Sequence, residues 1–192
     1  DWSSDVCSSD LKTGTVGRRI RRRMEFCQEE DPAGYAARLL DDPEELELLG
    51  RDLLIGVTDF FRDREMFLSL EESMRNLLRD RSSSDGLRIW SAGCASGEEA
   101  YSLAMLAQQV ADSVGFRGDI KVFATDVHRG ALATASAGIY PLEALDNLPD
   151  RYQERFFRCE ADDRCRIDPL LRRNVVFAHH NLLADPPFTR ID

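Results

Sequence analysis

The chain has 192 residues, a formal net charge of -10 and 43% hydrophobic residues, which is typical of a folded protein with one sizeable domain and a small appendage. The acidic balance argues against a nucleic-acid-binding protein, since such proteins carry a basic domain or face. No apolar run approaches the roughly 20 residues that span a bilayer, and the amino terminus lacks the apolar stretch of a signal peptide. We therefore expect a cytoplasmic protein without membrane insertion.

The amino-terminal stretch DWSSDVCSSD is rich in serine and aspartate and has no periodicity. We interpret residues 1–11 as a foreign or sequencing-derived leader and leave them out of the fold prediction. From Val16 to Leu40, apolar residues recur at helical spacing, with an interruption at Asp31 and Pro32. This pattern predicts two short helices.

The next helix has clearer start signals. Asp42 is a candidate N-cap, Pro43 fits the first helical position, and an acidic residue follows three positions after the cap. We expect this helix to end near Gly56. A further helix is predicted over Glu65 to Arg79, followed by the polar linker RSSSDG at Arg81 to Gly86. The domain boundary is predicted at that linker, with a helical amino-terminal domain over 12–80 and a second domain over 86–192.

One basic cluster interrupts the acidic composition. It packs five arginines into six residues: Arg18, Arg19, Arg21, Arg22 and Arg23. By default such a run is a solvated helix face. The alternative is a basic surface that binds an acidic partner.

The second domain alternates strands and helices. Strands are predicted at Leu87–Ala92, at Ile120–Ala124 and at 174–178, and helices at 98–114, 131–137 and 149–157. Strand, helix, strand implies an α/β fold with a parallel sheet and right-handed crossovers. The chain stops at Asp192, where another apolar strand is expected to begin. We therefore expect an incomplete sheet in which the first strand has one unpaired edge, and hence marginal solubility.

The stretch IWSAGCASGEEAY joins the first strand to the following helix through a turn that contains Gly93. Such turns bind nucleotide-like ligands in α/β sheets. Glu98 and Glu99 in the first helical turn repel anions, which favours a ligand that is neutral or cationic at that end. S-adenosylmethionine fits this requirement, and Asp126 after the second strand can accept hydrogen bonds from its ribose hydroxyls. Alternatively, the glutamates are simple helix-capping residues.

Four ordered stretches resemble the signatures of chemotaxis-type (CheR-like) protein-glutamate O-methyltransferases. They are GVTDFFR from Gly56, LRIWSAGCASGEEAYSLAM from Leu87, KVFATDV with the later AGIY, and NVVFAHHNLLADPPF from Asn174. The resemblance implies a Rossmann-like class I methyltransferase sheet, incomplete in this chain, after a small all-helical domain. In this family that helical domain carries a basic face directed at the receptor substrate, which implies a docking role for the five arginines.

The same resemblance implies roles for individual residues. Thr58 and Arg62 would line the S-adenosylmethionine site, with Gly93 in the turn. Glu99 would contact the methionine moiety, Asp126 the ribose, and Asn181 with Leu182 the adenine. Gly56 and Ala100 depart from the family pattern, which often has asparagine and proline there, and Gly56 has no side chain to make a hydrogen bond.

The implied reaction transfers a methyl group to glutamate carboxylates in the cytoplasmic domain of chemoreceptors, giving methyl esters and S-adenosylhomocysteine. A carboxylate is ionised at neutral pH, so no general base is needed and no metal is expected. Arg62 is the predicted catalytic residue, orienting the carboxylate; the alternative is a surface salt bridge with Asp63 or Glu65. The complete protein is expected to be a monomer.

Two other functions are considered. The sequence DPPF at 185–188 resembles the catalytic motif of DNA adenine amino-methyltransferases, but it does not directly follow an apolar strand and the net charge opposes DNA. The other is a non-catalytic module that binds the cofactor or docks on a receptor.

The neighbouring His179 and His180 point to opposite faces of a strand, so we predict one packed and one solvated residue rather than a metal site. The five scattered cysteines predict reduced thiols.

Overall fold

In the computed structural model, the described residues are 13–53, 58–82, 84–146, 148–160 and 163–192. The chain divides into two compact units, Asp1–Ile55 and Gly56–Asp192. The predicted boundary at Arg81 to Gly86 therefore falls inside the second unit. A polar linker marks a loop, but it does not by itself show which core the preceding helix joins.

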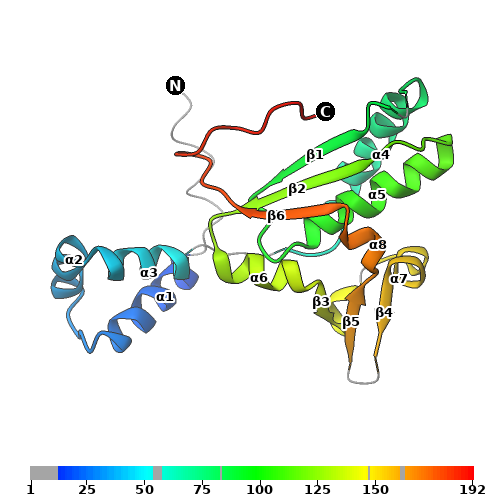
Figure 1. The fold of residues 1–192 in the computed structure, drawn as a ribbon. Helices are drawn as coiled ribbons and strands as arrows, with labels where there is room; N and C mark the ends of the chain where they lie inside the picture. The colour runs from blue at the N-terminus through cyan, green and yellow to red at the C-terminus, as the bar shows by residue number, and fades with distance from the viewer. Residues whose placement is uncertain (1–12, 54–57, 83, 147, 161–162) are drawn as a thin grey trace. The chain divides into compact units, whose positions relative to one another are not determined.

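The described part of the first unit, residues 13–53, contains three helices, α1 (Thr13–Phe26), α2 (Pro32–Asp41) and α3 (Pro43–Leu53) (Figure 1). Asp31 caps α2, because its carboxylate accepts a hydrogen bond from the Gly34 amide at 3.0 Å. Asp42 acts in the same way on α3, where it accepts from the Glu45 amide at 3.1 Å. The interruption at Asp31 and the start of α3 are thus confirmed. The predicted end near Gly56 lies outside the described residues, as does the leader 1–11.

The small core of this unit surrounds a buried carboxylate. Met24, Tyr35 and Leu49 form the apolar part, and Glu45 is only 5% exposed. Arg23 Nε donates to Glu45 at 3.0 Å, and the Tyr35 hydroxyl donates to it at 2.7 Å. These partners compensate the cost of burying the charge.

In the second unit, residues 58–63 form an irregular segment with a turn at Phe60 and Phe61 that leads into α4 (Arg64–Arg79). Phe67, Met74 and Leu78 of α4 are buried in the main core, where α4 packs against α5 (Glu98–Val114). These contacts explain why α4 belongs with the second unit.

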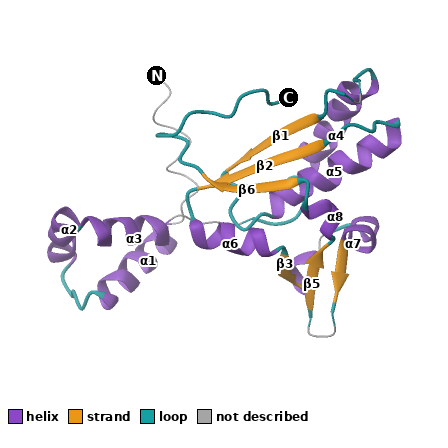
Figure 2. Ribbon diagram, in the orientation of Figure 1, coloured by secondary structure: helices purple, strands orange, loops and turns teal. Residues whose placement is uncertain are grey.

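The main sheet has the order β1-β2-β6 and is wholly parallel. Its strands are β1 (Leu87–Ala92), β2 (Ile120–Asp126) and β6 (Val175–His179). Helices α5 and α6 (Arg129–Ala137) cover one face, and the segment after β6 crosses the other (Figure 2). The parallel α/β arrangement predicted from the alternating strands and helices is confirmed.

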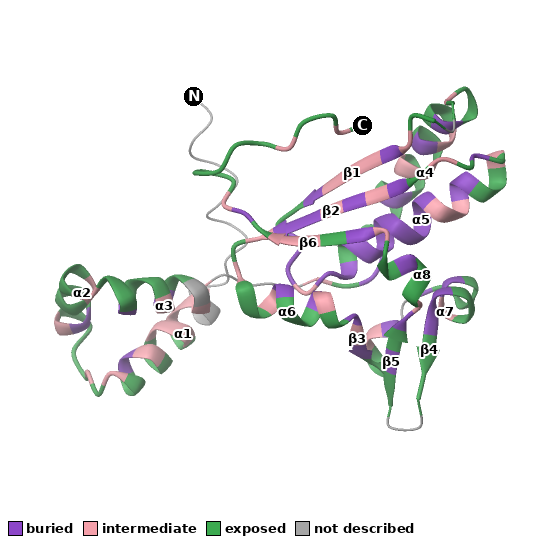
Figure 3. Ribbon diagram, viewed as in Figure 1, coloured by how far each residue is buried: buried purple, intermediate pink, exposed green. Residues whose placement is uncertain are grey.

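The two faces of this sheet are covered to different extents (Figure 3). Toward α5, Leu87, Val122 and Ala124 are fully buried. On the opposite face, Trp90 and Phe123 are only partly buried, and the Phe188 ring packs on both at centroid distances of 5.2 and 5.5 Å. Beyond β2, the described part of the chain gives β1 no further strand partner, as the sequence predicts. At this edge the Asp192 amide donates to the Arg88 carbonyl at 2.9 Å, and the Arg88 amide donates to the Asp192 carboxylate at 3.0 Å.

A second, antiparallel sheet of order β3-β5-β4 was not predicted. It comprises β3 (Ile139–Pro141), β4 (Phe157–Cys159) and β5 (Arg164–Ile167), with the short helices η1 (Leu142–Leu145), α7 (Asp150–Phe156) and α8 (Pro169–Arg172) beside them. Phe157 and Ile167 join it to the main core. Of the predicted elements, the helix at 149–157 corresponds to α7.

The prediction that all cysteines are reduced thiols is wrong for one pair. Cys159 and Cys165 are opposite each other in the β4–β5 register and form a disulfide. Sequence spacing alone could not show this, because the pairing depends on a hairpin register that the sequence did not reveal. Cys27 and Cys94 are free thiols. None of the described helices is long and apolar enough to cross a bilayer.

Candidate functional site

The carboxyl end of β1 leads into a tight turn that is hydrogen-bonded to β2. The amides of Gly93 and Cys94 both donate to the Thr125 carbonyl, at 2.7 and 2.9 Å. The next amide, that of Ala95, donates to a carboxylate oxygen of Asp126 at 2.8 Å. The turn is therefore fixed against the end of β2, where α/β proteins bind ligands.

The two glycines of the turn are needed for different reasons. Both have positive φ, 78° at Gly93 and 97° at Gly97, which disfavours residues with a side chain. A Cβ at position 97 would lie 2.8 Å from the Ala135 Cβ, so Gly97 permits close packing against α6. A Cβ at Gly93 would meet nothing within 4 Å. The open side of the turn at Gly93 can thus accommodate a ligand.

Asp126 is oriented by backbone amides. One carboxylate oxygen accepts from the His128 amide at 2.7 Å, and the other accepts from Ala95 at 2.8 Å. Each oxygen retains a further acceptor site, because a carboxylate has about four. The side chain is half-buried, so these remaining acceptors can bind two neighbouring hydroxyl groups, as the predicted ribose contact requires.

The structure separates the two glutamates that begin α5. Glu98 is buried, and burial raises the pKa of its carboxyl group, although the Ser96 hydroxyl donates to it at 2.7 Å. Glu99 is exposed and accepts from the Ser91 hydroxyl at 2.8 Å. Of these two glutamates, only Glu99 presents its carboxylate outside the core; its contact with the methionine moiety stays a prediction.

The segment before α4 carries two more predicted site residues, Thr58 and Arg62. Its aromatic residues anchor it: Phe60 packs edge-on against Tyr140 with centroids 5.0 Å apart, and Phe61 packs on Tyr152 at 4.6 Å. Both rings are buried, so they anchor the segment to the core. Thr58 is half-buried and Arg62 is exposed.

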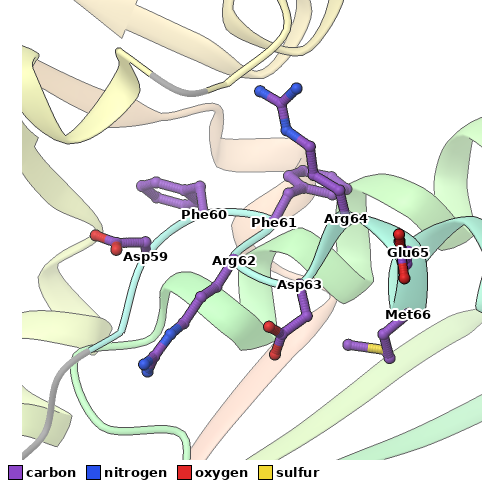
Figure 4. Close-up of a pocket in the computed structure, with 8 residues that line it drawn as sticks. All are labelled: Asp59, Phe60, Phe61, Arg62, Asp63, Arg64, Glu65 and Met66. Atoms are coloured by element: carbon purple, nitrogen blue, oxygen red, sulfur yellow. The ribbon is translucent and has the colours of Figure 1, made fainter.

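Residues 59–66 line a cavity of about 720 Å³. Figure 4 shows the Arg62 side chain extending to the other side of the segment from that of Arg64. The Arg62 residue also interacts with another group in the structure.

Asn181 and Leu182 follow β6 and His180, and a backbone hydrogen bond connects this part of the chain to Asp126. The His180 amide donates to the Asp126 carbonyl at 3.1 Å. The Asn181 side-chain oxygen accepts from the Leu183 amide at 2.9 Å, and the Leu182 side chain is 55% exposed. The predicted adenine contacts therefore lie at the same edge of the sheet as the ribose contact.

Phe188 of the DPPF motif and His180 pack on the second face of the sheet. Phe188 contacts Trp90, and the Pro186 carbonyl lies 3.1 Å from His180 Nε2. His180 is buried and His179 is exposed, as predicted. In this arrangement the aromatic residue of the motif covers the sheet, and no observation favours a flipped DNA base there.

The arginine run divides between surface and core. Arg18, Arg21 and Arg22 are exposed, whereas the Arg23 side chain is 14% exposed and pairs with Glu45. Arg19 is half-buried and donates to the Asp52 carbonyl. The structure therefore gives Arg19 and Arg23 contacts within the helical unit. The Glu45 carboxylate that Arg23 contacts was missed at the sequence level, because 22 residues separate the two.

Two further residues link parts of the site and were not predicted. The Tyr140 hydroxyl donates to the Ser96 carbonyl at 2.7 Å, and the Ser102 hydroxyl accepts from the Phe61 amide at 3.0 Å. Ser102 is a polar residue on an otherwise apolar helix face, and this exception to the pattern is what could have identified it from the sequence.

Comparison with known proteins identifies the fold family. Residues 56–192 match the family described as CheR methyltransferase, SAM binding domain. An uncharacterized 104.1 kDa protein of Rhodobacter capsulatus is 44% identical over 191 residues, 99% of this chain and 20% of that protein. Chemotaxis protein methyltransferase 2 of Pseudomonas aeruginosa is 34% identical over 182 residues, 93% of this chain and 63% of that protein.

A similar match is found to chemotaxis protein methyltransferase 2 of Vibrio cholerae, at 31% identity over 170 residues, 87% of this chain and 58% of that protein. The chain thus spans between about a fifth and about three fifths of these three relatives. The family match covers the whole second unit, including the turn at Gly93, Asp126 and Asn181. The chain therefore belongs to the CheR methyltransferase family, and its second unit is the S-adenosylmethionine-binding domain of that family.

Proposed function

We propose that the protein containing this chain transfers a methyl group from S-adenosylmethionine to glutamate side chains in the cytoplasmic domains of chemoreceptors. The products are glutamate methyl esters and S-adenosylhomocysteine. The names of the Pseudomonas and Vibrio relatives support the link to chemotaxis. The observation that carries the proposal is Asp126, whose carboxylate is oriented by two backbone amides beside the open turn at Gly93.

The donor set fits the cofactor. Asp126 has acceptors left for ribose hydroxyls, and the exposed carboxylate of Glu99 suits the ammonium group of the methionine moiety. Asn181 and Leu182 are proposed to bind the adenine, which is supported by their place directly after His180, whose amide donates to the Asp126 carbonyl. Thr58, Arg62 and Gly93 complete the proposed set. The anionic character of these carboxylates favours a cationic cofactor over a phosphate-bearing one.

The chemistry needs few protein groups. The cofactor supplies a methyl group on a sulfonium, and transfer breaks the carbon–sulfur bond as a carboxylate oxygen bonds to that carbon. The positive charge of the sulfur and the negative charge of the carboxylate are lost together. Because the attacking carboxylate is already ionised, the protein has to align it rather than deprotonate it.

Arg62 is the residue proposed to orient the substrate carboxylate. A cation on that carboxylate stabilises the reactants more than the transition state, in which the charge is fading. Its contribution is therefore geometric. Arg62 is exposed at the end of an anchored segment, so it can reach a protein substrate from solvent.

Receptor docking is proposed for the exposed arginines of α1, which are Arg18, Arg21 and Arg22. Arg19 and Arg23 contribute through the structure of the helix, since both bind acidic or carbonyl groups within their own unit. We further propose that the complete protein is a cytoplasmic monomer that uses no metal. A partner with an acidic surface suits a basic patch on an otherwise acidic chain.

The test is calorimetric titration of the chain with S-adenosylhomocysteine, beside Asp126→Ala. The matched control is Asp119→Ala, because Asp119 is an exposed carboxylate just before β2, at the opposite end of that strand. We expect saturable binding that Asp126→Ala abolishes and Asp119→Ala preserves. Absence of binding both in this chain and in a carboxyl-terminally extended chain would contradict the proposal. Binding without methyl transfer by the extended protein would favour the non-catalytic module.

A further inference from the structure

The segment 58–63 has neither helix nor strand structure, yet it carries Thr58 and Arg62. Its backbone position is therefore set by side-chain contacts. Phe61 is critical, because it adopts a left-handed conformation with φ 51°, which is unusual for a bulky residue and persists only when the surroundings impose it. Arg62 follows directly, so the direction in which it leaves the core depends on Phe61.

One buried hydroxyl holds Phe61 in this conformation. Ser102 is completely buried, and its Oγ accepts a hydrogen bond from the Phe61 amide at 3.0 Å. The same hydroxyl donates to the Glu98 carbonyl at 2.7 Å, one turn earlier in α5. Among the hydrogen bonds of the described residues, the Phe61 amide has no other acceptor.

The Ser102 hydroxyl thus connects the segment to the first turn of the helix that carries Glu99. An alanine at this position would leave a buried amide unpaired, which is more costly than the loss of an exposed hydrogen bond. Phe60 and Phe61 would still be drawn into the core by their apolar surface. The conformation at Phe61, rather than the burial of the segment, is what the hydroxyl determines.

We propose that Ser102 is a positioning residue for the cofactor site. It fixes Arg62 and Thr58 relative to Glu99 and the glycine turn by holding Phe61 in its left-handed conformation. The proposal rests on the proposed function, because Thr58 and Arg62 need fixed positions only if the segment lines the cofactor site. Ser102 itself need not touch any ligand.

The structure supplies a matched control one residue away. The Tyr101 hydroxyl is also buried and donates to the Ala135 carbonyl at 2.9 Å, toward α6 and away from the segment. Tyr101→Phe therefore removes a buried hydrogen bond from the same helix without affecting Phe61. The Ala135 carbonyl keeps its bond from the Gly138 amide.

The experiment measures S-adenosylhomocysteine affinity by calorimetry for the chain and for Ser102→Ala, Tyr101→Phe, Arg62→Ala and the double variant Ser102→Ala/Arg62→Ala. We expect Ser102→Ala to weaken binding about tenfold, within the usual range of coupling between sites, and Tyr101→Phe to change it less than twofold. Because Ser102 acts partly through Arg62, the loss of affinity in the double variant should be smaller than the sum of the two single losses. Additive losses would overturn the proposal.

Hydrogen exchange at the Phe61 amide provides a readout that needs no ligand. Ser102→Ala should lose protection there, while Tyr101→Phe should keep it. If Ser102→Ala does not fold, Ser102→Cys retains a weak donor and acceptor, and an intermediate loss of affinity is expected. Unchanged affinity in a folded Ser102 variant refutes the positioning role alone. Absence of product binding by both the wild-type chain and a carboxyl-terminally extended chain refutes the proposed site, and the positioning role with it.

Discussion

Glu45 in the helical unit and Asp126 in the second unit are both carboxylates held by two partners, but the partners differ. Glu45 is 5% exposed and accepts from the side chains of Arg23 and Tyr35. Asp126 is half-buried and accepts from backbone amides of Ala95 and His128. A cationic side chain neutralises the first carboxylate within the core. Amides orient the second and leave its charge for a ligand, so the type of donor separates a structural carboxylate from a binding one.

The largest expected effect is on the structural carboxylate. Glu45→Ala removes the closer acidic partner of the largely buried Arg23 and leaves Asp52 at 3.9 Å; breaking such a pair typically costs about 3 kcal/mol. Hydrogen exchange in α2 and α3 should show this loss of stability, while affinity for S-adenosylhomocysteine stays within twofold. Exposed Glu47 on the same helix supplies the control Glu47→Ala. If Glu45→Ala left exchange in both helices unchanged, the buried pair would not stabilise this unit.

Lowering the pH should weaken the pair of Arg23 and Glu45. The hydrogen bond from Arg23 is the main reason why the pKa of Glu45 is lowered from 4.5 to about 2. Since the folded-state pKa is below the unfolded value, this stabilisation is present above pH 4.5 and is lost as the pH falls toward 2. Exchange in α2 should accelerate over that interval, and Glu45→Gln should remove this part of the pH dependence.

Removing the disulfide tests whether the stability of the second unit depends on one cross-link as strongly as that of the helical unit depends on the Arg23–Glu45 pair. Replacing Cys159 and Cys165 by serine frees a short loop, and the chain-entropy relation for such a loop gives about 2 kcal/mol. Urea unfolding can be followed by the fluorescence of Trp90 in a Trp2→Phe background, since the chain has two tryptophans. Equal stability of the oxidised protein and the serine variant would contradict this expectation.

Replacing Asp126 should have a smaller effect, and this effect should fall on ligand affinity rather than on stability. Asp126→Asn keeps an oxygen acceptor for one amide but removes the charge and half of the acceptor sites. We expect at least a tenfold loss of S-adenosylhomocysteine affinity, about 1.4 kcal/mol, with a smaller change in unfolding free energy. A variant that lost stability and kept its affinity would place Asp126 in the same class as Glu45.

The smallest effect on stability is expected from the surface arginines. Reversing the charge at Arg21 and Arg22 should change unfolding free energy by less than about 0.5 kcal/mol each, because surface substitutions generally do. Methylation of receptor fragments by the complete protein should nevertheless fall, at unchanged cofactor affinity. An equal loss of receptor methylation and of cofactor affinity would show that these arginines stabilise the fold.

The sequence predicted the elements whose signals are local. The strands at Leu87 and Ile120 have enough residues to show their pattern, and the turn between Gly93 and Glu99 has a characteristic composition. The family resemblance then assigned roles to residues such as Asp126 and Asn181, which the structure places along one edge of the sheet.

Features that depend on distant partners could not be predicted. The strands of the small sheet have three or four residues each, too few to show a period, so the Cys159–Cys165 pairing was also missed. Arg23 resembled its neighbours in the arginine run until the position of Glu45 was known. The same holds for Ser102, whose partner Phe61 is 41 residues away.

The close approach of Gly97 to Ala135 has an evolutionary consequence. With 2.8 Å between a hypothetical Cβ at position 97 and the Ala135 Cβ, neither residue can enlarge while the other stays as it is. Gly97 is already the smallest residue and has positive φ, so no substitution at position 97 could make room for a larger residue at 135, which would require a shift of α6. Both positions should consequently stay small across the family, although neither side chain carries any chemistry.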